Sequence, residues 1–253
     1  MLRKEVRPDS GRLTTRARLT KVSEAGDMII ENFDFEVLHQ GQPVYSGDAY
    51  FGFFTDQALS NQTGIHDAAK RVSMYARDAI KKTKAHIFED QAPLTPHDST
   101  LDPAPLLTMP AKALRMIDTI ETYLPEGGPH GQGFICGVKK VDPQEWFFKA
   151  HFFQDPVMPG SLGLESLVQL LKFMALVRWK NLENSHRFEL ITGKPHTWTY
   201  RGQVIPQNNI IEVEAVVTDI QDTPVPTLQA NGFLKVDGLY IYEMTGFGIR
   251  LTC

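Results

Sequence analysis

Cysteine is scarce in this chain of 253 residues, which contains only Cys136 and Cys253. Two cysteines are too few for the disulfide framework that stabilises many small secreted domains. They also offer too few ligands for a structural zinc site. The reducing cytoplasm is therefore the expected location, and we expect no bound metal.

Positive charge is not in excess either, because 26 lysines and arginines face 30 acidic residues, for a formal net charge of −4. Binding to phosphate backbones requires a concentrated basic face, so we expect no nucleic-acid partner. The N-terminal residues are basic but lack the apolar run of a signal peptide. No window approaches the roughly 18 apolar residues of a membrane span, so we expect no such span.

The last third of the chain has the period-two pattern of half-buried antiparallel strands. In IIEVEAVVTDI, residues 210–220, apolar side chains alternate with Glu212, Glu214 and Thr218, and LQANGFLKV continues the alternation. Residues 12–22, RLTTRARLTKV, have the same design near the start of the chain. Both ends of the chain are therefore expected to form sheets with one solvent-exposed face and one buried face.

The two sheet regions also match residue by residue. LRKEVRPDSGRLTTRARLTKV, residues 2–22, aligns without a gap on YRGQVIPQNNIIEVEAVVTDI, residues 200–220, and pairs Arg, Val and Pro with their counterparts. FEVLHQGQPVYSGDAYFGFFT parallels GFLKVDGLYIYEMTGFGIRLT with small adjustments. Alternation alone can match by chance in sheet proteins, but identical residues at one offset favour two related modules.

The repeat suggests a domain organisation. We expect a partial first module of strands at residues 1–60, a linker with a surface helix at 61–110, and a complete module at 111–253. The proline-rich stretch APLTPHDSTLDPAP supports the linker. No region at the start of the chain corresponds to the early strands and helix of the second module, so we expect that the chain was cut from a longer protein and begins inside its first module.

The second module is predicted to hold one long buried helix. Its early strands are expected at LRMIDTIETYL, GFICGVKKV and EWFFKAHF. From Leu162 to Val177, apolar residues fall on every face of the predicted helix, which is typical of a helix surrounded by protein. One long central helix wrapped by a curved antiparallel sheet is the hotdog fold, an α+β class. We therefore predict a tandem hotdog whose first module is incomplete.

The most informative stretch is HFFQDPVMPGSLGLESLVQ, residues 151–169. It resembles the active-site motif of the beta-hydroxyacyl-ACP dehydratases, in which a histidine precedes a D-P-V-M-P-G turn and a helix that carries Asp or Glu and then Gln. The half-repeat arrangement resembles the dehydratase regions of polyunsaturated fatty acid synthases and related polyketide synthases. Glu165, where the isomerising members carry Asp, resembles the branch that only dehydrates.

The resemblance implies roles for five residues, and the chemistry explains them. Removing water from a 3-hydroxyacyl thioester requires a base, an acid and stabilisation of the thioester oxygen. His151 suits the base, with the Val157 carbonyl holding its other ring nitrogen. Glu165 suits the acid or the hydroxyl-binding group, and Gln169, one turn further, could orient it. The Gly160 N–H at the helix start suits the thioester carbonyl, and Ser161 is expected to cap the helix.

The resemblance also implies partners. In these dehydratases the histidine and the carboxylate of one site come from two neighbouring hotdog modules, and residues 1–110 contain no second copy of the motif. Either an upstream segment supplied the partner or two chains associate, and we expect a homodimer. The expected substrate is a 3-hydroxyacyl chain on the phosphopantetheine of an acyl carrier protein, with no metal or redox cofactor.

Two other functions fit the same predicted fold. Acyl thioesterases share the hotdog architecture, and fold alone does not decide function. A non-catalytic acyl-binding or structural module is the third interpretation, because the first module is incomplete. The spacing from His151 to Glu165 through the proline turn favours elimination over hydrolysis.

Overall fold

The computed structural model describes residues 1–253 except residue 27 and residues 76–85 and 88–105. The chain forms two compact units, one of Met1–Gln62 with Leu190–His196 and one of Thr63–Glu189 with Thr197–Cys253. The domain boundaries expected from the sequence stay predictions. The helix expected in the linker is present as α2, Ala68–Tyr75, and the proline-rich stretch of residues 92–105 lies outside the described residues.

The first unit is built on a three-stranded antiparallel sheet in the order β1-β2-β3. Its strands are joined by short turns and are followed by one short helix. The elements are a 3-10 turn at Pro8–Ser10, β1 at Leu13–Ala25, β2 at Met28–His39, β3 at Gln42–Phe53 and α1 at Asp56–Ser60. The alternation at the start of the chain therefore forms strands as predicted.

The second unit contains an antiparallel sheet in the order β4-β5-β6-β9-β10-β11-β7, with β8 pairing to β11. Its early strands are β4 at His86–Ile87, β5 at Thr119–Leu124 and β6 at Phe134–Lys140. Its later strands are β7 at Arg187–Leu190, β8 at Thr197–Tyr200, β9 at Ile210–Gln221, β10 at Thr227–Val236 and β11 at Leu239–Thr252. Two 3-10 turns complete the unit, at Lys112–Leu114 and Lys180–Leu182.

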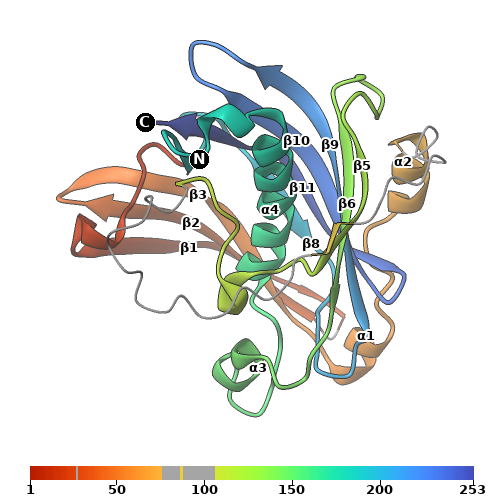
Figure 1. Cartoon of the computed structure of the whole chain (residues 1–253). Helices are drawn as coiled ribbons and strands as arrows, with labels where there is room; N and C mark the ends of the chain where they lie inside the picture. Colours follow the sequence, from red (N-terminus) through yellow and green to blue (C-terminus); the bar gives the residue numbers. More distant parts are fainter. Residues whose placement is uncertain (27, 76–85, 88–105) are drawn as a thin grey trace. The chain divides into compact units, whose positions relative to one another are not determined.

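The long helix α4, Gly160–Arg178, runs along the curled sheet of this unit (Figure 1). Leu167, Leu170 and Leu171 are fully buried, and the helix contacts β6, β9, β10 and β11. Burial on several faces explains why apolar residues surround the helix axis. The predicted α+β hotdog architecture, a central helix wrapped by antiparallel strands, is confirmed.

The sequence expectation that no window resembles a membrane span was wrong for α4. By length and composition alone, Gly160–Arg178 is long and apolar enough to cross a membrane. Most of that window is buried inside the chain, which accounts for its apolar character without a bilayer.

One predicted strand is a helix instead. EWFFKAHF was expected to extend as a strand, but Trp146–Ala150 forms the short helix α3. Phe147 and Phe148 are adjacent in sequence and both are buried, at 2% and 6% exposure. A short apolar run has no periodicity that separates a strand from a turn of buried helix, which is why the prediction failed.

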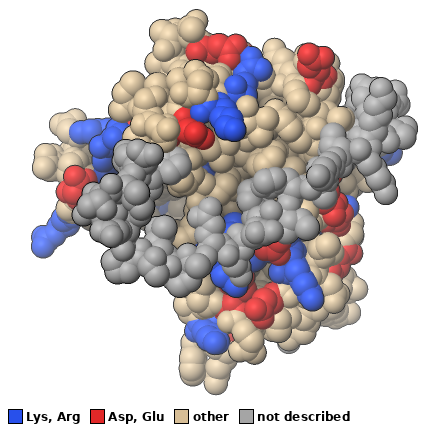
Figure 2. Space-filling view, in the orientation of Figure 1, with Lys and Arg blue, Asp and Glu red and all other residues tan. Residues whose placement is uncertain are grey.

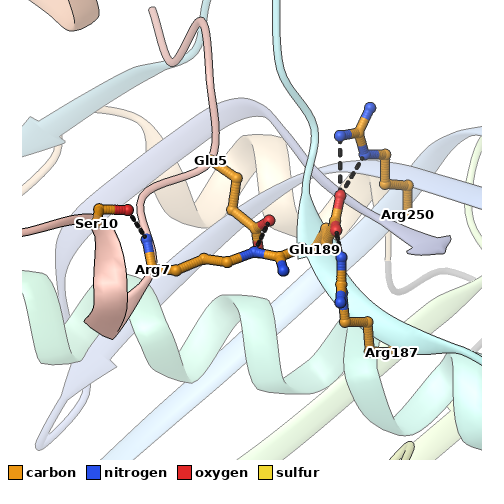
Figure 3. Close-up of polar contacts among 6 residues, drawn as sticks. All are labelled: Glu5, Arg7, Ser10, Arg187, Glu189 and Arg250. Atoms are coloured by element: carbon orange, nitrogen blue, oxygen red, sulfur yellow. Dashed lines mark hydrogen bonds and ion pairs between the residues drawn. The ribbon is translucent and has the colours of Figure 1, made fainter. Parts of the chain in front are cut away.

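Charged side chains are largely paired or dispersed. On the face shown in Figure 2, acidic and basic residues are interspersed, and the described residues there form no broad patch of one sign. The buried carboxylate of Glu189 contacts Arg187 and Arg250, each at 2.9 Å from a guanidinium nitrogen (Figure 3). A buried carboxylate requires such partners, and this pairing ties β7 to β11.

Candidate active site

His151 lies in the turn between α3 and α4, where two main-chain bonds fix its position. Its N–H donates to the Phe147 carbonyl at 2.9 Å, and its own carbonyl accepts from the Val157 N–H at 2.9 Å. The side chain is partly buried, and its Nδ1 lies 2.9 Å from the Val157 carbonyl oxygen. A carbonyl can only accept, so Nδ1 carries the hydrogen and, in the neutral ring, Nε2 carries the lone pair. This is the tautomer that a base acting through Nε2 requires.

The helix start provides the donor expected for a thioester oxygen. Gly160 is the first residue of α4, so its N–H is one of the four that have no acceptor within the helix. Pro159 is the N-cap, and its carbonyl accepts from the Leu162 N–H at 2.9 Å. The expectation that Ser161 caps the helix was wrong, because Ser161 lies inside the first turn and no side chain caps this end.

Two aromatic rings of the edge strand β8 pack beside Gly160. A Cβ placed at Gly160 would lie 3.4 Å from the Tyr200 ring and 3.7 Å from the Trp198 ring. Both side chains remain exposed, Tyr200 at 37% and Trp198 at 46%. A partly exposed aromatic surface therefore borders the start of α4, and no pattern in the sequence indicated this placement.

Glu165 and Gln169 meet on α4 as the one-turn spacing predicts. Gln169 is fully buried, and its amide nitrogen donates to Glu165 Oε1 at 3.0 Å and to the Leu114 carbonyl at 2.8 Å. Its amide oxygen accepts from the Met116 N–H at 2.8 Å. Gln169 thus anchors Glu165 to the segment before β5.

Glu165 is less buried than the sequence suggested. Its side chain is 31% exposed and forms an ion pair with Lys172, whose Nζ lies 2.8 Å from Oε1. Sequence reasoning missed Lys172, although its position one turn beyond Gln169, on the same helix face, was a signal that could have found it. Both contacts of Glu165 fall on Oε1, and among the described residues no hydrogen bond reaches Oε2.

The structure does not join the two predicted catalytic side chains. Among the described residues, no hydrogen bond or ion pair links His151 to Glu165. Each is instead held by its own partner, Val157 for the histidine and Gln169 with Lys172 for the carboxylate. The site therefore consists of two separately organised halves.

We expect the hydrogen bonds of Gln169, which anchor Glu165, to contribute to the free energy of unfolding. Replacing Gln169 with leucine should lower the free energy of unfolding by about 1–3 kcal/mol, because the buried Met116 N–H loses its acceptor. Denaturant unfolding of the two proteins measures this difference. Gln207→Leu, at an exposed position, serves as control and should change stability little. An unaltered stability in Gln169→Leu would show that this N–H is satisfied otherwise.

Comparisons with known proteins show which family the chain belongs to. The family model of the FabA-like domain matches residues 109–245, more than half of the sequence. The chain belongs to the FabA-like family.

One curated relative and two solved structures illustrate the similarity. A polyunsaturated fatty acid synthase subunit of Thraustochytrium sp. is 29% identical over 242 residues, which cover 92% of this chain and 16% of that protein. This chain therefore spans about a sixth of that relative. The dehydratase domain from the CurJ module of curacin polyketide synthase aligns over 91% of this chain and 66% of its own, with 12% identity and a TM-score of 0.41. The dehydratase heterocomplex ApeI:P from Xenorhabdus doucetiae aligns over 59% and 91%, with 10% identity and a TM-score of 0.39.

Proposed function

We propose that this chain removes water from 3-hydroxyacyl thioesters carried by an acyl carrier protein and produces 2-enoyl thioesters. The observation that carries the proposal is the ring of His151, whose Nδ1–H bond to the Val157 carbonyl presents a basic Nε2. The similarity to part of a polyunsaturated fatty acid synthase favours a role in polyunsaturated fatty acid synthesis. The scarcity of cysteine is the basis for proposing a cytoplasmic location.

In the proposed reaction, His151 takes a proton from Cα, and the C–O bond at the next carbon breaks as the double bond forms. The Gly160 N–H donates to the thioester oxygen while negative charge develops there, at the positive end of α4. The departing hydroxyl gains a proton and leaves as water, so the products are one enoyl thioester and one water molecule.

For Glu165, the ion pair with Lys172 favours the hydroxyl-binding role over that of proton donor. Lys172 stabilises the ionised carboxylate at Oε1, and an ionised carboxylate can only accept hydrogen bonds. Oε2 then accepts from the substrate hydroxyl and fixes its direction. The imidazolium formed on His151 supplies the proton that leaves with the hydroxyl.

A direct assay tests the proposal. The purified chain is given a 3-hydroxyacyl thioester while enoyl-thioester absorbance and free thiol are both followed. Enoyl product is expected from the parent, with a rate about 10²-fold lower for Glu165→Ala. Glu183→Ala, which alters a glutamate outside this site, should leave the rate unchanged. Release of thiol instead of enoyl product would replace the proposal with thioester hydrolysis, and binding without reaction would indicate an acyl-binding module.

The site is proposed to form in a homodimer, in which His151 of one chain works with Glu165 of the other, because residues 1–110 contain no second copy of the motif. Mixing the His151→Ala and Glu165→Ala proteins should then give more activity than either protein alone, because hybrid dimers contain one intact site. A mixture that stays inactive while the chains exchange between dimers would contradict a site shared between two chains.

A further inference from the structure

One face of the β1-β2-β3 sheet is apolar and exposed. The register places Leu19 opposite Phe33, Val22 opposite Glu31 and Ile29 opposite Phe53, so these side chains share one face with Glu31 among them. We name this surface the apolar face; its exposed members are Leu13, Leu19, Val22, Ile29, Phe51 and Phe53, which are 40–61% exposed. Contiguous exposed apolar surface marks interaction sites more often than single apolar residues do.

The sheet repeats the geometry of β9-β10-β11, beginning with the hairpin turns. Gln40 and Gly41 join β2 to β3, and Asp237 and Gly238 join β10 to β11. All four residues have positive φ, at 51° and 79° in the first turn and 46° and 89° in the second. Two-residue turns with two positive φ angles fix the pairing register, so both hairpins start in the same way.

Two bulges also recur at equivalent positions. Thr20 is the extra residue of β1 where β1 pairs with β2, and Thr218 is the extra residue of β9 where β9 pairs with β10. Val44 is the extra residue of β3, and Ile241 is that of β11. Bulges bend and twist strands locally, so the two sheets share these two curvature devices. The second sheet has one further register shift, between Ala230 and Gly232 of β10, for which β2 and β3 have no counterpart.

One main-chain hydrogen bond outside the strands also recurs at equivalent positions of the two sheets. The Arg3 N–H donates to the Val44 carbonyl at 2.8 Å, and the Arg201 N–H donates to the Ile241 carbonyl at 2.8 Å. The sequence alignment pairs Arg3 with Arg201, and both acceptors are bulge residues. The alignment and the backbone therefore define one equivalence between the sheets.

The equivalent faces differ in what covers them. The face of β9-β10-β11 packs against α4. The counterparts of Leu13, Leu19, Phe51 and Phe53 there are at most 2% exposed; they are Ile211, Val217, Ile249 and Leu251. The same sheet design thus has a helix on one copy, while four matching apolar side chains on the other copy remain exposed by 40% or more.

At the centre of each face a glycine lies opposite a large residue, but the glycine is on β10 in the second sheet and on β3 in the first. At Gly232, opposite Met244, a Cβ would lie 2.9 Å from the Leu167 side chain of α4, so the helix approaches closely there. In the first sheet the corresponding pair is Phe35 opposite Gly47, and the Phe35 ring lies 3.2 Å from a Cβ placed at Gly47. A helix on this face would therefore meet a large ring where α4 meets glycine.

We propose that the apolar face binds an apolar α-helix of about the length of α4, supplied by a polypeptide outside the described residues. This helix carries a small residue where α4 has Leu167, because Phe35 already fills that space. The inference rests on the repeated sheet and is independent of the proposed reaction.

A peptide of residues 160–178 with Leu167→Ala, ended by a short lysine tail, is the probe. Its binding to the full chain is measured by fluorescence anisotropy, with amide exchange of β2 as a second readout. We expect saturable binding and slower exchange in β2. Phe51→Asp should weaken binding at least about tenfold, because it places a charge in the contact. Tyr50→Asp, on the opposite face of the same strand and similarly exposed, should not.

The unaltered α4 peptide, with leucine at position 167, should bind about tenfold more weakly than the probe, because its side chain overpacks against Phe35. Equal affinity of the two peptides would contradict the required small residue. No binding by the folded parent, or equal binding by the Phe51→Asp and Tyr50→Asp proteins, would overturn the helix site. A parent dimer that Phe51→Asp dissociates, without peptide binding, would assign the face to a second copy.

Discussion

Replacing His151 with alanine should lower the rate of enoyl-thioester formation by about 10²–10⁴-fold, the range typical of a removed general base. The substitution deletes the ring that the Val157 carbonyl orients but leaves the main-chain bonds of His151 to Phe147 and Val157 in place. The turn should therefore keep its shape. The effect is measured as initial rates of enoyl-thioester formation at substrate concentrations below and above KM. We expect kcat to fall and KM to change little.

Two controls separate chemistry from folding. His130→Ala removes a histidine from an exposed loop and should retain the parent rate. Denaturant unfolding of His151→Ala should show a stability close to the parent, because the ring is only partly buried. A His151→Ala protein that keeps the parent kcat would refute its role as the base.

Glu214→Gln should stabilise the protein at about pH 8 by up to about 3 kcal/mol. Glu214 lies on β9, and burial raises the pKa of its carboxyl from 4.5 to about 7; Lys235 on β10 opposes this shift and Glu212 adds to it. Cys136 on β6 is its cross-strand neighbour, and Tyr240 on β11 is also near. Its buried Oε1 has no hydrogen-bond partner among the described residues.

The direction of the pH effect follows from the raised pKa. Below about pH 4.5 the carboxyl is protonated in both the folded and the unfolded chain, so the parent keeps its full stability. As the pH rises toward about 7, the unfolded chain releases this proton first, and the free energy of unfolding falls. Glutamine cannot ionise, so the variant should not show this loss.

The measurement is the free energy of unfolding of both proteins across this pH range. Glu212→Gln is the matched control, because Glu212 is two residues away on the same strand and pairs with Lys235 at 2.7 Å. That control retains Glu214, so its free energy of unfolding should still fall as the pH rises. A constant difference between the parent and Glu214→Gln from about pH 4 to 8 would show that Glu214 does not titrate in this way.

Features that depend on local patterns were predictable from the sequence. The alternation of residues 210–220 predicted β9, and the unbroken apolar surface of residues 162–177 predicted the buried helix α4. The repeat between the two ends of the chain anticipated equivalent hairpins. The bond between Glu165 and Gln169 followed from one turn of helix, and the bond between His151 and Val157 followed from the motif.

Features that depend on tertiary packing were not predictable in the same way. Helix α3 forms where two adjacent phenylalanines both become buried, which no periodicity signals. The N-cap shifted from Ser161 to Pro159 because the chain enters the helix in an extended conformation at Pro159. The partial exposure of Glu165 depends on which parts of α4 the rest of the chain covers. The apolar residues beside Glu165 in the sequence do not reveal this tertiary arrangement.

The order of elements along the chain has a consequence for synthesis. Helix α4 ends at residue 178, whereas β9, β10 and β11, which cover it, span residues 210–252. At about 5–20 residues per second, a ribosome needs several seconds to complete these strands after the helix is made. During that interval the nascent chain carries a helix as apolar as a membrane span without its cover, so chaperone binding should be strongest then and should end once β11 emerges.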